Sequence, residues 1–129
     1  MNYNEFLTRV GQNGGPTEHN HADAASKQVL ATLGQRLDGR EPRDLASQLP
    51  AELQSPLLEH VGAAETTDDL DDFLHRVADR EGYGCTTEAA LAHSRAVLGT
   101  IAGFVSTGEI HDLRSQLPTG FKTLFEPTT

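Results

Sequence analysis

The sequence predicts an all-α protein in which two repeated units of about four helices pack as one domain about a pseudo-twofold axis. Two observations predict this fold. Apolar residues recur at helical spacing, and no segment shows the alternation and hairpin turns of paired strands. In addition, the second half of the chain repeats the first. We therefore expect a single domain over 1–129, with repeat one at 1–60, a linker at 61–67 and repeat two at 68–127.

Three pairs of segments carry the repeat, at an offset of 67 residues for the first pair and 68 for the other two. The pairs are YNEFLTRV (3–10) with LDDFLHRV (70–77), QVLATLGQRL (28–37) with AVLGTIAGFV (96–105), and DLASQLP (44–50) with DLRSQLP (112–118). A half of about 60 residues has little core of its own, so we expect the two halves to pack against each other.

Each half is expected to begin with a helix and to continue with a longer one. In the first segment the i, i+3, i+4 and i+7 positions that form one helix face are Tyr3, Phe6, Leu7 and Val10. Two apolar stripes predict the longer helices: Ala22, Ala25, Val29, Leu33 and Leu37 in the first half, and Ala90, His93, Val97, Ile101 and Val105 in the second. Gly39 and Gly108 mark where these helices should stop.

The repeated DLxSQLP motif predicts a short helix, a sharp corner and a new helix. Asp44 and Asp112 fall near the start of the short helix, where a negative charge interacts favourably with the helix dipole. Pro50 and Pro118 cannot continue that helix and can begin the next one.

Residues matched between the halves are expected to be structural, because a scaffold requirement applies to every copy whereas a monomeric enzyme usually builds one site. These residues are Arg9, Arg76, Asp44, Asp112, Gln48, Gln116, Pro50 and Pro118. We expect Arg9 to reach Asp44. In the same way, we expect Arg76 to reach Asp112. The alternative is a symmetric pair of partner-binding sites.

Composition argues against several classes of partner. The net charge of −9 repels nucleic-acid phosphates and anionic membrane surfaces, so neither is an expected partner. The single cysteine cannot form an intramolecular disulfide, which fits a reducing compartment. The first residues lack the basic and apolar regions of a signal peptide, and we expect a cytoplasmic location.

Histidine and cysteine provide weak candidates for chemistry. His19 and His21 could share a metal ion only if they lie in a loop, because i and i+2 point apart on a helix. His93 lies on the apolar stripe and is expected to be a partly buried, hydrogen-bonded histidine. Cys85 precedes a predicted helix capped by Thr86 or Thr87, a position that favours a thiolate. No His or Asn is placed in the sequence to mark a cysteine nucleophile, so we expect a passive thiol, with a reactive thiol as the alternative. No zinc-type Cys/His spacing and no catalytic motif is present in the sequence.

Small residues line one side of the second long helix, a feature that differs between the halves. Those in the second are Gly99, Ala102 and Gly103, and the matching positions in the first are Ala31, Gly34 and Gln35. Small side chains let another helix approach closely. We expect that helix to come from the other half of the chain, with a second copy in a dimer as the alternative.

The paired FLxRV, VLxTL and DLxSQLP pattern resembles the prokaryotic family catalogued as domain of unknown function 2267. The resemblance extends from Tyr3 to Glu126 and is most specific in the doubled DLxSQLP. It implies the helical fold and no catalytic residues. The loop GQNGGPTEHNH (11–21) is longer than the family pattern.

Symmetry, acidity and the absence of a catalytic motif favour a non-enzymatic protein-interaction module, whose partner is an unknown protein or the chain itself as a homodimer. The alternative is a small-ligand or metal-binding protein with a pocket between the halves and His21, His93 or Cys85 at its edge. An enzyme whose site assembles only in space is a third hypothesis. No cofactor is predicted.

Overall fold

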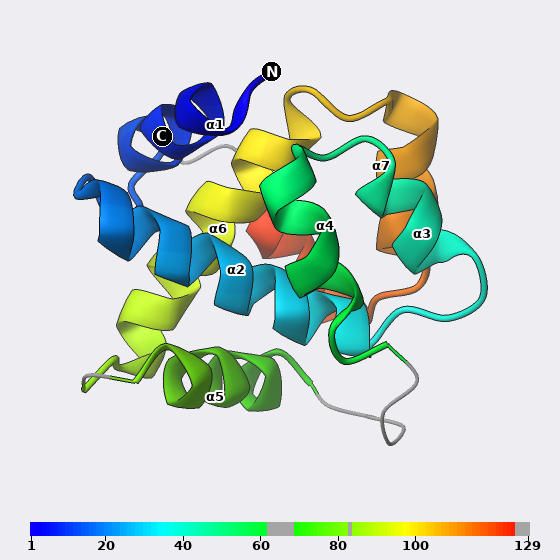
Figure 1. The fold of residues 1–129 in the computed structure, drawn as a ribbon. Coiled ribbons are helices and arrows are strands. Elements are labelled where there is room, and N and C mark those ends of the chain that lie inside the picture. Colours follow the sequence, from blue (N-terminus) through cyan, green and yellow to red (C-terminus); the bar gives the residue numbers. More distant parts are fainter. Residues whose placement is uncertain (62–68, 83, 126–129) are drawn as a thin grey trace.

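The computed structural model describes residues 1–61, 69–82 and 84–125, and these residues form helices and no strands. The all-α prediction is therefore confirmed for the described chain. The helices, in chain order, are α1 (Tyr3–Gln12), α2 (His19–Gln35), α3 (Glu41–Ala46), α4 (Ala51–Leu58), α5 (Leu70–Glu81), α6 (Thr87–Ala102), α7 (Thr107–Ser115) and the 3-10 helix η1 (Thr119–Phe125) (Figure 1).

The two halves interlock through their first helices. The long helices α2 and α6 lie in the middle of the molecule (Figure 1). Helix α1 packs on α6 as well as on α2, and α5 packs on α2 as well as on α6. Each half therefore completes its core with the other half, as its small size requires. The order of helices is the same in both halves, and their pseudo-twofold relation stays a prediction.

The predicted apolar stripes form the centre of the core. All ten of their residues are buried. Helix α2 ends at Gln35 and α6 at Ala102, several residues before Gly39 and Gly108, so Leu37 and Val105 contribute to the core from just beyond the helices. Burying one large apolar side chain stabilises the fold by about 1.5–3 kcal/mol.

Aromatic side chains from both halves join this core. Phe6 on α1 and Phe73 on α5 are fully buried at matching positions, and so is Phe121 on η1. The Phe73 and Phe121 rings meet edge to face, with their centres 5.2 Å apart. The first helix of each half is thus fixed by a buried phenylalanine.

The DLxSQLP motif turns the chain as predicted in its first copy. Helix α3 ends at Ala46, and Pro50 immediately precedes α4. The second copy differs, because Asp112 lies inside α7 rather than in its first turn, and the segment after Pro118 is the 3-10 helix η1. The prediction that Asp112 lies near a helix start was therefore wrong.

Each motif also makes a hydrogen bond to its own backbone. Ser47 Oγ donates to the carbonyl oxygen of Asp44, and Ser115 Oγ donates to that of Asp112, at 2.7 Å in both cases. Such bonds satisfy carbonyl groups at the ends of the short helices.

The two glutamines of the motif hydrogen-bond across the halves in a reciprocal way. Gln48 accepts from the backbone N–H of Ser106 at 2.8 Å and donates to its hydroxyl oxygen at 3.1 Å. Gln116 accepts from the backbone N–H of Asp38 at 2.9 Å and donates to its carbonyl oxygen at 3.4 Å. The offset between Asp38 and Ser106 is 68 residues, the same as between the glutamines. These bonds connect each corner to the residues that precede the short helix of the other half.

The expected contact between Arg9 and Asp44 is not found among the described residues. Arg9 is exposed on α1, and no hydrogen bond or ion pair joins it to Asp44. The expected contact between Arg76 and Asp112 stays a prediction. What the structure shows at the corners is the reciprocal glutamine bonds.

The closest helix approach is at Gly34, where α2 crosses α4. A Cβ atom built at Gly34 would lie 1.9 Å from the backbone oxygen of Leu57, which no real structure tolerates. At Gly99 on α6 an added Cβ would meet no atom within 4 Å. Close helix approach therefore occurs within the first half, contrary to the expectation that the small residues admit the other half.

No helix in the part of the chain that the structure describes is both long and apolar enough to cross a bilayer.

Candidate metal centre

A cleft of about 610 Å³ opens where the start of α2 meets the end of α5 and the start of α6. Besides Glu18, which caps α2, four of its residues carry groups that bind metals: His21, Glu81, Cys85 and His93. We call this place the His–Glu cleft. His21 comes from the first half of the chain and the other three from the second, so the cleft lies between the halves.

Local backbone features place each residue. Glu18 caps α2, and its carboxylate accepts from the backbone N–H of His21 at 2.8 Å, which fixes His21 in the first helical turn. The backbone hydrogen bonds from His21 and then Asn20 lower the pKa of Glu18, so this cap is charged at neutral pH. At the end of α5, Gly82 has a φ of +69°, a left-handed conformation that favours glycine and ends the helix directly after Glu81.

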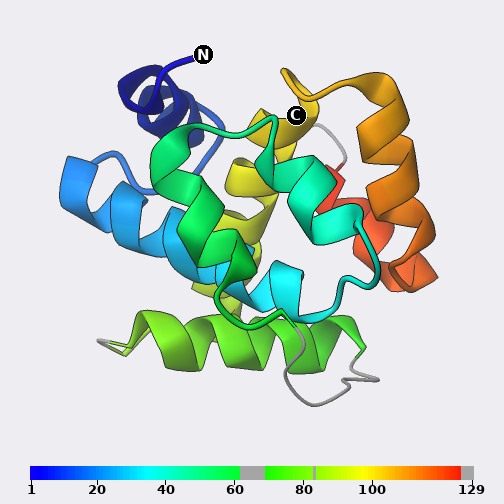
Figure 2. The same cartoon turned by 45° about the vertical axis from the view of Figure 1, so that its right-hand side comes forward.

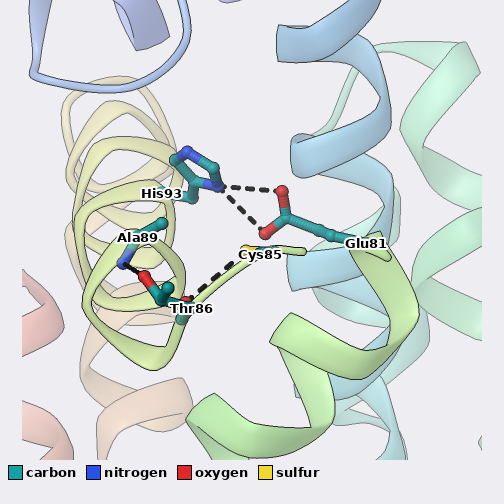
Figure 3. A network of polar contacts seen from close by, with 5 residues as sticks. All are labelled: Glu81, Cys85, Thr86, Ala89 and His93. Carbon is teal, nitrogen blue, oxygen red and sulfur yellow. Dashed lines mark hydrogen bonds and ion pairs between the residues drawn. The ribbon is translucent and has the colours of Figure 1, made fainter. Parts of the chain in front are cut away.

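His93 and Glu81 form the buried centre of the cleft. Nδ1 of His93 lies 2.8 Å from one carboxylate oxygen of Glu81 and 3.0 Å from the other (Figure 3). The side chains are only 11% and 4% exposed. The expectation that His93 is partly buried and hydrogen-bonded is confirmed. A metal ion bound by both residues would take the place of this hydrogen bond, because Nδ1 is the ring nitrogen that faces the carboxylate.

His21 lies at the exposed edge of the cleft. Its ring meets that of His93 edge to face, with centres 5.3 Å apart. One ligand atom each of His21, Glu81 and His93 lie within 4.8 Å of one another. Ligand atoms around a tetrahedral zinc ion are about 3.4 Å apart, given metal–ligand bonds of about 2.1 Å. An exposed His21 side chain can make this adjustment by a rotamer change.

Cys85 lies at the edge of the cleft. Burial, followed by the charge of Glu81 and a hydrogen bond with it, raises the pKa of the Cys85 thiol. These effects favour the neutral thiol over the thiolate. The predicted cap is confirmed at Thr86, whose hydroxyl oxygen accepts from the backbone N–H of Ala89 at 3.1 Å (Figure 3).

His19 and His21, the weak candidate pair that required a loop, lie in a helix instead. Both residues lie in the first turn of α2, where the i and i+2 positions point apart. His21 instead approaches His93 and Glu81, which are distant in sequence.

The cleft residues are not part of the repeat. At the offset of 68 residues, His93 corresponds to Ala25 and His21 to Ala89. A requirement of the scaffold would appear in both halves, as the DLxSQLP motif does. Side chains that occur in one half only are therefore better candidates for function than the matched residues.

Sequence reasoning identified three of the four cleft residues and missed Glu81. Glu81 is one of several acidic residues near the end of α5, and no spacing relates it to His93 before the fold is known. The adjacent Gly82, which ends the helix, was the one local signal that Glu81 faces a turn rather than a helix surface.

Comparison with known proteins gives a family and no function. No curated protein matches the chain. A family model described as "Uncharacterized conserved protein (DUF2267)" matches residues 3–124, which confirms the resemblance seen in the repeated motif. The chain therefore belongs to the DUF2267 family of uncharacterized conserved proteins.

Proposed function

We propose that this protein binds a divalent transition-metal ion, of which zinc is the representative, in the His–Glu cleft. The observation that carries the proposal is the convergence of His21, Glu81 and His93, whose ligand atoms lie within 4.8 Å of one another. Three helices, α2, α5 and α6, supply them, and His21 is distant in sequence from the other two. Two imidazoles and a carboxylate are a ligand set that suits zinc and other first-row metals.

The electrostatics of the cleft support this proposal. The Glu81 side chain is 4% exposed, and a buried carboxylate is costly unless a positive charge compensates it. A bound dication would supply that charge. It could also displace the proton of the Cys85 thiol, since metal coordination stabilises thiolates.

The ligand set defines what the site can do. Three protein ligands leave one tetrahedral position for water, for a small ligand or for Cys85. The cleft is open to solvent at His21, so an ion can enter without unfolding.

The interaction-module hypothesis keeps the status of a prediction, as does the cytoplasmic location. No surface feature favours the module: within the described ranges the exposed large hydrophobic residues are Met1 and Val61. An apolar docking patch normally gathers several such side chains.

The test is a zinc titration of chelator-treated protein in competition with a chromophoric chelator. We expect one zinc ion per chain. Loss of a ligand in His21→Ala or Glu81→Gln should weaken binding by at least about 100-fold, since even partners behind the ligands contribute 10–100-fold. His19→Ala is the matched control, because it removes an exposed histidine from the same helical turn. Equal affinities of the His19 and His21 variants, or no zinc uptake, would refute the proposal.

A further inference from the structure

A second group of ligand-type side chains lies between α3 and α7, which pack side by side (Figures 1 and 2). The sequence reads EPRDL at 41–45 and EIHDL at 109–113, again with an offset of 68 residues. A glutamate and an aspartate three residues apart lie on one helix face. The four acids are Glu41, Asp44, Glu109 and Asp112, and we call them the four-carboxylate cluster.

The two glutamates of this cluster are buried against each other. Glu41 is 6% exposed and Glu109 is 8% exposed. Glu41, Asp44 and Glu109 each have a carboxylate oxygen within 4.8 Å of those of the other two. Asp112 is close enough for its charge to act on Glu41.

Neither glutamate is fully satisfied in its buried position. The Oε1 atoms of Glu41 and Glu109 are buried and have no hydrogen-bond partner. Within residues 1–61, 69–82 and 84–125, no Lys, Arg or His side chain forms an ion pair with either glutamate. Glu41 and Glu109 also hydrogen-bond each other, which requires that one of them carries a proton when no cation is bound. Two buried carboxylates side by side are costly when both are charged, because each one costs several kcal/mol unless a shared proton or a cation compensates it.

We propose that Glu41, Asp44 and Glu109 bind one hard divalent cation, of the calcium or magnesium class, between α3 and α7. The donors are all carboxylate oxygens, which such cations prefer, and the cluster contains no nitrogen or sulfur ligand. The two unsatisfied Oε1 atoms would gain a ligand bond. Asp44 is exposed, so it provides the route by which the ion enters.

This site is independent of the His–Glu cleft in both place and chemistry. It uses α3 and α7 rather than α2, α5 and α6, and it selects oxygen-binding cations rather than zinc. Since α3 belongs to one half and α7 to the other, the ion would hold the two halves together. Either proposal can fail without affecting the other.

The test measures binding of Ca²⁺ alone, and separately of Mn²⁺ alone, to the full-length, chelator-treated protein by calorimetry, together with the shift in melting temperature. We expect one ion per chain and a rise in melting temperature with ion concentration. The double variant Glu41→Gln, Glu109→Gln preserves side-chain volume and should lower the affinity at least about tenfold. The matched control is Asp71→Asn, Asp72→Asn, which removes the same charge from an exposed part of α5 and should bind as the wild type does.

Two results would overturn the proposal. One is no binding and no thermal shift at about 10 mM of either ion, well above the weakest calcium sites of about 1 mM. In that case a proton alone compensates the glutamates. The other is equal loss of affinity in the control, which would mean non-specific attraction to an acidic protein. If the glutamate variant does not fold, Asp44→Asn decides, because this exposed ligand should also lower the affinity about tenfold while the fold is retained.

Discussion

Replacing Gly34 with alanine adds a methyl group where α2 and α4 touch through their backbones. The new Cβ would lie 1.9 Å from the carbonyl oxygen of Leu57, and contacts below 3.0 Å do not occur. The two helices must therefore separate by more than about 1 Å in a close-packed core. A flexible side chain could move aside, but the obstacle here is a helix backbone.

The expected change in the free energy of unfolding follows from two opposing effects. Overpacking costs about 1–3 kcal/mol, and the backbone contact at Gly34 places this case at the upper end. Alanine recovers about 1 kcal/mol over glycine in a helix interior. The net loss is about 2 kcal/mol, a large share of the 5–15 kcal/mol typical of a domain.

Urea unfolding followed by circular dichroism measures this difference. With a slope of about 2 kcal/mol/M, the midpoint of Gly34→Ala should fall by about 1 M. Gly99→Ala is the control, since its Cβ meets nothing within 4 Å and the same helix preference should raise the midpoint slightly. A Gly34→Ala protein as stable as the wild type would refute the close approach of α2 and α4.

Three further predictions concern hydrogen bonds and pH. Gln48→Ala removes both hydrogen bonds to Ser106 and should lower the free energy of unfolding by about 1 kcal/mol in the same urea titration. An unchanged midpoint would show that these exposed bonds do not stabilise the fold. In chelator-containing buffer, the raised pKa of Glu41, caused by burial and then by Glu109, stabilises the fold fully below pH 4.5, and this contribution is lost as the pH rises to about 8, so the melting temperature of the wild type should decline over this range. Glu41→Gln should flatten the decline, and a parallel decline in both proteins would contradict the prediction. Tyr3→Phe removes the hydroxyl that donates a hydrogen bond to Asp23. Burial raises the pKa of the Asp23 carboxyl, but hydrogen bonds from Tyr3 and Lys27 outweigh it and lower that pKa. The variant should have a smaller free energy of unfolding than the wild type at pH 7, and the difference should shrink as the pH falls below about 3.9, whereas a constant difference would rule out this linkage.

Patterns within single helices were sufficient to predict most of the fold. The apolar stripes from Ala22 to Leu37 and from Ala90 to Val105 identified two long helices and their buried faces, because helical periodicity is a local property of the sequence. The first helix and the corner at Pro50 were predictable for the same reason. Exact ends were less predictable, since both long helices stop before the glycines that should end them.

Contacts between distant helices could not be predicted in the same way. Arg9 and Asp44 are oppositely charged, and both are matched in the second repeat. Charge alone does not give the direction in which a side chain points. At this corner the contact is made by Gln48, which accepts a hydrogen bond from the backbone N–H of Ser106. Glu81 can be recognised as a candidate ligand only once the fold shows that the end of α5 lies beside His93. The surroundings of Cys85 were predictable only in part, because the helix start was visible in the sequence, whereas burial and the neighbouring carboxylate were not.

The buried glutamates show a different limit. Glu41 and Glu109 lie three residues before the aspartates of the repeated motif, so the matched pair was visible in the sequence. A charged residue is usually exposed, and nothing local indicated that α3 and α7 would bury these two against each other.

Anomalous X-ray diffraction at the zinc absorption edge, from crystals grown with one equivalent of Zn²⁺, tests the central claim most directly. The claim predicts one anomalous peak in the His–Glu cleft, about 2.0–2.2 Å from ligand atoms of His21, Glu81 and His93. A zinc peak elsewhere with an empty cleft, or no ordered peak at all, would contradict it.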